Sequence, residues 1–288
     1  MPATQELIEQ IIQREIPAFA SEFKKRYTSK GSGIKNLLYK ANNPFIQALG
    51  EEIVIYSALM RSLDSSLGNR IEKIAQAIAE ASYDVSKKVE GDVPIGVDER
   101  ISTLMNSYTN KTRTPKAADL KEITVVGQKL GSIEHKVHMS DYHLVKKSDD
   151  RQHFLLELKI GGDLDNKKAR SEKQALLEQY AILRYSPKIR PESVIKLYFA
   201  TAYNKFGEGE WTQGRVKQFF GDDELLIGRD FWNFICDHGE GNTMVLNAYK
   251  QYAPILKVAL EGIIRVAKEN VGLTNKSLWE EDTKIQPH

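Results

Sequence analysis

The stretch HFLLELKIGGDLDNKK, residues 153–168, places two charged side chains inside an apolar run and follows them with two glycines and alternating acids and bases. Residues 153–160 have the length and composition of a β-strand, in which successive side chains point to opposite faces. Glu157 and Lys159 therefore share one face. Three apolar side chains are expected to point to the other face, into a core: Leu156, Leu158 and Ile160. An edge strand that ends in a solvated turn is the alternative interpretation.

A second strand is predicted upstream of this one, over residues 134–146, and a turn at residues 148–150 separates the two. A hairpin of this kind would bring Asp141, which lies 16 residues before Glu157, close to the Glu157 carboxylate. Two carboxylates and a lysine that converge at a strand end would form a site for a hard divalent cation. Two other acids are alternative sources of the first carboxylate: Glu134 and Asp149.

The expected ligands of that cation are all oxygen atoms. Magnesium is typically held by one or two carboxylates together with waters and substrate phosphate oxygens. Asp141, Glu157 and the main-chain carbonyl of Leu158 would supply the protein ligands. Lys159 would stand beside a water on the metal, or neutralise charge on the pentavalent phosphorane. This set is what in-line hydrolysis of a phosphodiester requires, although spacing alone also fits a charged pair on a half-exposed strand.

The remainder of the chain indicates two regions. Residues 1–130 are predicted to be mainly helical, and residues 131–288 to form a core with C-terminal helices. Within the core, residues 165–183 have the apolar spacing of an amphipathic helix, and residues 194–203 read as a strand buried on both faces. The order of elements predicts an α/β (α+β) fold, with a central mixed sheet flanked by helices.

The helical region contains several start and stop signals. Apolar residues recur at helical spacing over residues 5–24, where Pro17 is expected to kink the helix or to mark a restart. Asn43 is expected to cap a helix with Pro44 at its first position, and Gly50 to interrupt that helix. Two further segments are predicted here: a loop at residues 91–99 and a short helix at residues 99–109.

Composition places the chain among ordinary globular proteins. It has 288 residues, of which 41% are hydrophobic and 28% charged, enough to bury a substantial core. The single cysteine, Cys236, excludes an intramolecular disulfide and fits a reducing cytoplasm. The N-terminus has acids where a signal peptide needs bases, and no apolar run reaches the length of a membrane span.

Positive charge is concentrated around the opening stretch. The net charge is −1 over residues 1–100, +6 over residues 101–200 and −3 over residues 201–288. A second basic segment, FKKRYTSKGSGIKNLLYK at residues 23–40, contains six lysines or arginines and no acid. Such segments would track a phosphate backbone, or would form a solvated surface.

Several segments together resemble a known family. Asp141 followed by Glu157-Leu158-Lys159 in a helix-rich chain resembles the PD-(D/E)XK nuclease motif, with Ser140 in place of the proline that usually precedes the aspartate. The continuation ELKIGGDLDNKKARSEKQALLEQYAIL is similar to TdeIII-type type II restriction endonucleases. Three other segments share that similarity: NPFIQALG, SLGNRIEKIA and GRDFWNFICDHGEG, spread from Asn43 to Gly241.

The resemblance implies a magnesium-dependent homodimer that cuts both strands of double-stranded DNA at a short pseudo-palindromic site, GC-rich and of the GGNCC kind. It also implies a cognate DNA methyltransferase as genetic neighbour. Residues 1–130 would serve dimerisation and DNA contacts. The alternatives are a structure-directed or repair nuclease of the same fold, and a DNA-binding module that has lost catalysis.

Further site residues are expected on two predicted helices. Glu72, in SLGNRIEKIA, resembles a glutamate that related nucleases bring towards the metal, and a solvent-facing position is its alternative. Gly161 and Gly162 would either allow close approach of the backbone to DNA or simply end the strand. Basic residues that follow the glycines would hold backbone phosphates, or would lie on a solvated helix face: Lys167, Lys168, Arg170 and Lys173.

Overall fold

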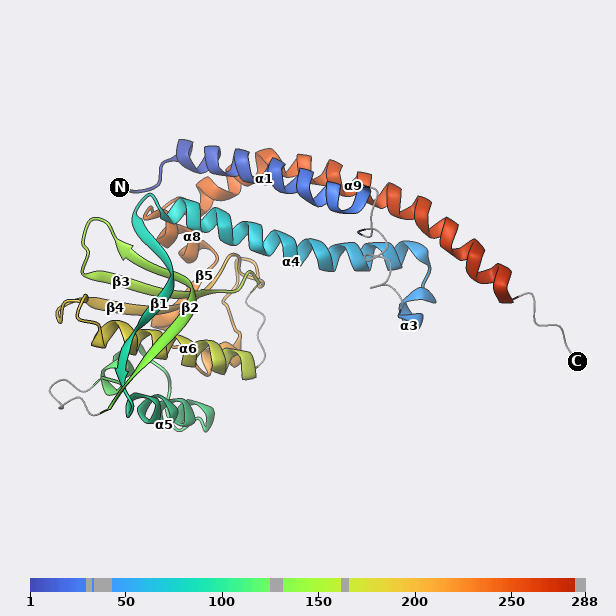
Figure 1. Ribbon diagram of the computed structural model, residues 1–288. Helices are drawn as coiled ribbons and strands as arrows, with labels where there is room; N and C mark the ends of the chain where they lie inside the picture. The colour runs from blue at the N-terminus through green and yellow to red at the C-terminus, as the bar shows by residue number, and fades with distance from the viewer. Residues whose placement is uncertain (30–32, 34–42, 125–131, 162–165, 283–288) are drawn as a thin grey trace, which may run out of the picture. The chain divides into compact units, whose positions relative to one another are not determined.

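A computed structural model of the chain (Figure 1) describes residues 1–29, 33, 43–124, 132–161 and 166–282. The chain forms two compact units, one comprising Met1–Leu7 and Ala75–Met244, the other Ile8–Ile74 and Val245–His288. Each unit combines segments from both halves of the sequence. The division of the chain at residue 130 into two functional regions stays a prediction. No helix in the described part of the chain is long and apolar enough to cross a membrane.

The first unit is built on one five-stranded mixed sheet, as the sequence predicted. The strands lie in the order β1-β2-β3-β4-β5; β1, β2 and β3 pair antiparallel, whereas β3, β4 and β5 are parallel. A helix connects the parallel strands β3 and β4, the usual crossover for such a pair. The bounds are Tyr83–Pro94 for β1, Ile133–Lys146 for β2, Gln152–Leu158 for β3, Val194–Thr201 for β4 and Leu225–Ile227 for β5.

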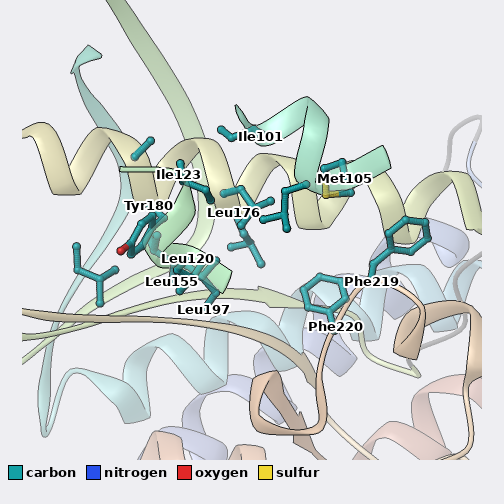
Figure 2. Close-up of a cluster of buried hydrophobic side chains, with 14 of the residues drawn as sticks. Ile101, Met105, Leu120, Ile123, Leu155, Leu176, Tyr180, Leu197, Phe219 and Phe220 are labelled. Carbon is teal, nitrogen blue, oxygen red and sulfur yellow. The ribbon is translucent and has the colours of Figure 1, made fainter. Parts of the chain in front are cut away.

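Helices cover both faces of this sheet. Figure 2 shows Leu155 of β3 and Leu197 of β4 packed in one cluster with Leu176 of α6 (Asn166–Tyr185) and Met105 of α5 (Val97–Thr109). On the other face, α8 (Arg229–Cys236) places Phe234 against three sheet aromatics. These are Tyr83, Phe154 and Tyr198, with ring centroids 5.0–5.6 Å from that of Phe234. Because both faces are covered, almost every side chain of β3 is buried.

Three short helical segments complete this unit. They are α7 (Gly214–Lys217) and the 3-10 helices η1 (Ala117–Glu122) and η2 (Asp222–Glu224). The last of them carries Glu224, the carboxylate of which binds the ammonium of Lys173 on α6 at 2.5 Å. Both side chains are only 1% exposed, so this ion pair fixes α6 against the segment that precedes β5.

The second unit is helical. The described residues of this unit form the helices α1 (Gln5–Thr28), α3 (Pro44–Gln47), α4 (Glu51–Ala79) and α9 (Gly241–Asp282), of which α1, α4 and α9 run side by side in Figure 1. Their shared core includes Phe23, Leu59 and Ile263, all fully buried. Beside it, Arg70 of α4 donates to the buried Glu15 of α1 at 2.7 Å.

The predicted signals of the helical region had different outcomes. Asn43 caps α3 as predicted, accepting a hydrogen bond from the Phe45 N–H at 3.0 Å, and Gly50, with φ of 101°, separates α3 from α4. The restart predicted at Pro17 is wrong, because α1 continues through the proline, whereas the alternative of a kink stays a prediction. Apolar residues on both sides of the proline are buried, and this packing outweighs the one hydrogen bond that proline cannot donate: Ile12, Ile16 and Phe19.

Two other predictions need correction. The loop predicted at residues 91–99 is the end of β1, followed directly by α5, which confirms the short helix expected at residues 99–109. The strand at residues 194–203 is present as β4, but its first half alternates between exposed and buried side chains. Most of the basic segment at residues 23–40 lies outside the described residues.

Candidate active site

A bulge in β2 shapes the site. The β1–β2 ladder pairs Ser86 with His143 and Lys88 with Met139, so β2 advances four residues where β1 advances two. Bulges of this kind re-aim side chains and are frequent beside active sites. The residue at its centre is Asp141, which immediately precedes Tyr142, and the pair of Tyr142 with Leu156 is the last regular one between β2 and β3.

The bulge places the Asp141 carboxylate against β3, the strand that carries Glu157. Its Oδ2 accepts a hydrogen bond from the main-chain N–H of Leu158 at 2.9 Å. The N–H and C=O of one strand residue point to the same neighbouring strand, so the Leu158 carbonyl is also directed towards β2. The two alternative acids lie elsewhere: Glu134 contacts Lys136 at 3.1 Å, and Asp149 binds Arg151 in the hairpin turn at 2.8 Å.

Ser140 precedes this aspartate inside the bulge. Its side chain is buried, and within the described structure its hydroxyl has no hydrogen-bond partner. Proline is accepted at bulges because the regular ladder is interrupted there. The bulge therefore accounts for a position that takes either proline, as in the resembled motif, or a small residue.

Glu157, in β3, and Lys159, just after its last residue, have their side chains on the same side, as predicted. The Lys159 ammonium donates to Glu157 Oε1, and Glu157 is only 9% exposed. Burial, together with the negative charge of Asp141, raises the pKa of Glu157 to about 8, and the opposing effect of Lys159 is smaller. Burial alone would lower the pKa of Lys159, but the charges of Glu157 and Glu172 outweigh it and raise that pKa. The site thus holds two carboxylates that repel each other and one ammonium ion.

Two residues that the sequence did not single out lie nearby, Glu172 against Lys159 and Tyr203 against Gly161. Glu172 of α6 contacts the Lys159 ammonium with its Oε1 atom at 3.2 Å. Tyr203, just beyond β4, is 53% exposed, and a Cβ atom added at Gly161 would lie 2.6 Å from its hydroxyl oxygen. Gly161 thus allows the approach of a tyrosine, whereas Gly162 lies outside the described residues.

The predicted phosphate-binding residues of α6 separate into two groups. Lys167 and Lys168 are exposed in the first turn, and Arg170 donates to Asn106 of α5 at 3.1 Å. Lys173 is fully buried in its ion pair with Glu224, so the structure does not place it where a phosphate could reach it. The role expected for Lys173 is corrected to a structural one.

The position of Glu72 in relation to the acid pair stays a prediction. Glu72 lies on α4 within the helical unit, whereas Asp141 and Glu157 belong to the sheet unit. Its side chain is partly exposed.

The acid pair and the lysine converge at the carboxyl end of β3, the first strand of the parallel part of the sheet, where open α/β sheets usually bind ligands. A family model described as "Type II restriction endonuclease, HinfI" matches residues 4–253. A comparison with curated proteins found no match. Because the family match covers most of the 288 residues, the chain belongs to the HinfI family of type II restriction endonucleases and is a site-specific deoxyribonuclease.

Proposed function

We propose that this enzyme hydrolyses phosphodiester bonds of double-stranded DNA in a magnesium-dependent reaction at Asp141, Glu157 and Lys159, and that its core is of the PD-(D/E)XK type. The observation that carries the proposal is the hydrogen bond from the Leu158 N–H to Asp141, which joins the two acid-bearing strands. It brings an acid from β2 to the strand that carries the Glu-Leu-Lys sequence.

The residues present fit a magnesium ion. Two carboxylates and the Leu158 carbonyl are hard oxygen donors, the type that magnesium prefers. The raised pKa of Glu157 reflects a buried carboxylate beside the charge of Asp141, and a bound cation would relieve that repulsion. The described residues contain no group of three His, Cys, Asp or Glu side chains that could hold a metal, so waters and substrate oxygens would complete the coordination.

When bound, magnesium would supply Lewis-acid polarisation of the phosphate and a lowered pKa for the attacking water. The protein would then hold the side chains of the site in place and orient them. Asp141 is fixed by the main chain of β3, and Glu157 is fixed by burial between the sheet and α6. Lys159 would hold its ammonium beside the scissile phosphate and stabilise the negative charge that develops there.

DNA contacts are proposed at the first turn of α6. Lys167 and Lys168 are exposed, and Arg170 is partly exposed on the same segment, a few residues after the catalytic strand. Such side chains hold backbone phosphates and position the duplex without reading sequence. Residues 204–215 follow β4 and are the candidates for contacts with base edges.

The finer properties of the enzyme are proposed from the resemblance to TdeIII-type enzymes. They are a homodimer, a pseudo-palindromic GC-rich site of the GGNCC kind, and a cognate methyltransferase as genetic neighbour. A cytoplasmic location is favoured by the single cysteine, Cys236, which is free and buried. Glu72 is proposed to approach the metal, and residues 1–130 to contribute to dimerisation and DNA contacts.

Digestion of plasmid DNA with the full-length protein tests this proposal. Discrete fragments that appear with magnesium and not with EDTA are expected, and sequencing of their ends gives the recognition site and the overhang. A preference for branched or damaged DNA over a fixed sequence would instead support a structure-directed nuclease. DNA binding in calcium without cutting in magnesium would identify a silent binding module.

A further inference from the structure

Lys159 is held by two carboxylates that come from different elements. One is Glu157 of β3, two residues before Lys159, and the other is Glu172 of α6, with its Oε1 atom 3.2 Å from the Lys159 ammonium. The side chains of Lys159 and Glu172 are 31% and 24% exposed. The ammonium therefore lies in a partly desolvated position between two negative charges.

In the proposed function, one of these two carboxylates has a second task. Glu157 is a metal ligand, so its oxygen lone pairs would be shared between the cation and Lys159. Lysine has a flexible four-carbon stem, and an ammonium that loses one partner can leave a productive position unless another group holds it. Glu172 is the acid on α6 that already contacts this ammonium.

We propose that Glu172 is a positioning residue, which keeps the Lys159 ammonium directed at the reaction centre while Glu157 binds the metal. This inference rests on the proposed function and adds to it a residue on a different element. Glu172 would act through Lys159 and would not touch the substrate. The 3.2 Å contact and the placement of Glu172 on the rigid α6 carry the inference.

The rigidity of α6 comes from its buried face. The residue next to Glu172 is Lys173, which is locked to Glu224 at 2.5 Å beneath the Phe220 ring. Ala169 and Leu176, one turn away on each side, are fully buried in the main core. The helix therefore cannot rotate freely, and the direction of the Glu172 side chain is set by the packing of its neighbours.

Two other roles for Glu172 fit the structure less well. As a third metal ligand it would belong to a cluster of acids, and the described residues form no metal-binding group of three such side chains. As an ordinary surface ion pair it would be exposed on both sides, whereas about two thirds or more of each partner is covered.

The test compares Glu172→Gln with Glu178→Gln in the full-length enzyme. Glu178 is a matched control, because it lies on the same helix, is 18% exposed and pairs with His138 at 3.1 Å, away from Lys159. The measurements are the single-turnover cleavage rate in magnesium, the KM, DNA binding in calcium and the Tm. Glu172→Asp, which keeps the charge on a shorter arm, is the second variant.

We expect Glu172→Gln to lower the cleavage rate about tenfold to a hundredfold, the scale of a misplaced catalytic group. KM, calcium-supported DNA binding and Tm should stay at the wild-type values, Glu172→Asp should recover part of the rate, and Glu178→Gln should cut normally. Equal rates for the two glutamine variants, or a loss explained by weaker DNA binding or lower Tm, would overturn the inference. Failure of the wild-type enzyme to cut would instead overturn the proposed function.

Discussion

The Asp141 carboxylate accepts a hydrogen bond from the main-chain N–H of Leu158 at 2.9 Å. This bond ties the acid of β2 to the strand of Glu157 at the point where the regular ladder ends. It shows how an aspartate 16 residues earlier in the sequence becomes the neighbour of Glu157. The hairpin and its bulge, rather than proximity in sequence, assemble the acid pair.

Replacing Asp141 by asparagine should abolish most activity without unfolding the protein. The amide oxygen of Asp141→Asn can still accept from the Leu158 N–H, but one negative charge of the acid pair is lost. Because metal ligation supplies several kcal/mol to such reactions, cleavage in magnesium should fall at least about a hundredfold. The initial cleavage rate and the Tm are the quantities to measure.

Asp149→Asn is the matched control for this variant. Asp149 sits in the hairpin turn, where it binds Arg151, and it was an alternative to Asp141 on sequence grounds. The control should retain near wild-type cleavage. If Asp149→Asn lost activity while Asp141→Asn kept it, the assignment of the first carboxylate would be wrong.

Glu157 should make the metal-free protein less stable as the pH rises. Burial first, and then the charge of Asp141, raises its pKa from 4.5 to about 8. Between these two values the folded state retains a proton that the unfolded state has released, so the free energy of unfolding falls with increasing pH. This contribution is fully present below the unfolded pKa and is lost by about pH 8.

Glu157→Gln should remove that loss, because glutamine does not ionise. The free energy of unfolding is measured with urea, in EDTA, at about pH 5 and about pH 8. Between these two pH values the difference in this free energy between the variant and the wild type should shift in favour of the variant by on the order of 2–4 kcal/mol. Parallel pH profiles for the two proteins would show that Glu157 is not a strained, buried acid. Active-site residues commonly reduce stability in this way.

Lys173 should matter for folding and not for DNA contact. Lys173→Met leaves the buried Glu224 carboxylate without its cation, which should lower the free energy of unfolding by about 3–5 kcal/mol. The double variant Lys173→Met with Glu224→Gln should recover much of this loss, because no uncompensated charge remains. Urea unfolding measures both effects.

Lys167→Ala provides the opposite case on the same helix. Lys167 is exposed, so its removal should leave unfolding unchanged while it weakens DNA binding and reduces the salt dependence of that binding. A result in which Lys173→Met weakened DNA binding with no loss of stability would contradict the structural role of Lys173.

The sequence predicted the central hairpin because its signals agree. Residues 153–158 combine an apolar run with a turn immediately before it, and the observed β2 and β3 differ from the predicted strands by one or two residues. The proximity of Asp141 to Glu157 also followed from a hairpin. The bulge itself was not predictable, because it depends on the pairing of β2 with β1.

Strand β1 was not predicted from the sequence, and the character of its side chains explains why. In Tyr83–Pro94 only three residues are buried, and charged or small residues fill the exposed positions. Those three are Tyr83, Val89 and Val93. A strand that is half solvated and directly follows a long helix lacks both the apolar run and the turn signal that identify strands.

Glu172 and Lys173 are neighbours on α6, and together they show the limits of prediction from helical spacing. Ala169, Leu176 and Tyr180 were recognised as one apolar stripe, and Lys173 occupies the position between the first two on the same face. Lys173 was nevertheless expected to hold a phosphate or to lie on a solvated face, because the sequence does not show that Glu224 lies opposite it and pairs with it. The contact of Glu172 with Lys159 depends on how α6 crosses β3, which is a tertiary relationship that spacing does not contain.

Cleavage of plasmid DNA by wild type and by Glu157→Ala, each with magnesium and with EDTA, tests the central claim most directly. The account predicts discrete fragments from the wild-type enzyme in magnesium alone, and none from the variant, while the variant keeps its fold. Wild-type-like cutting by Glu157→Ala would contradict the proposed reaction at Asp141, Glu157 and Lys159.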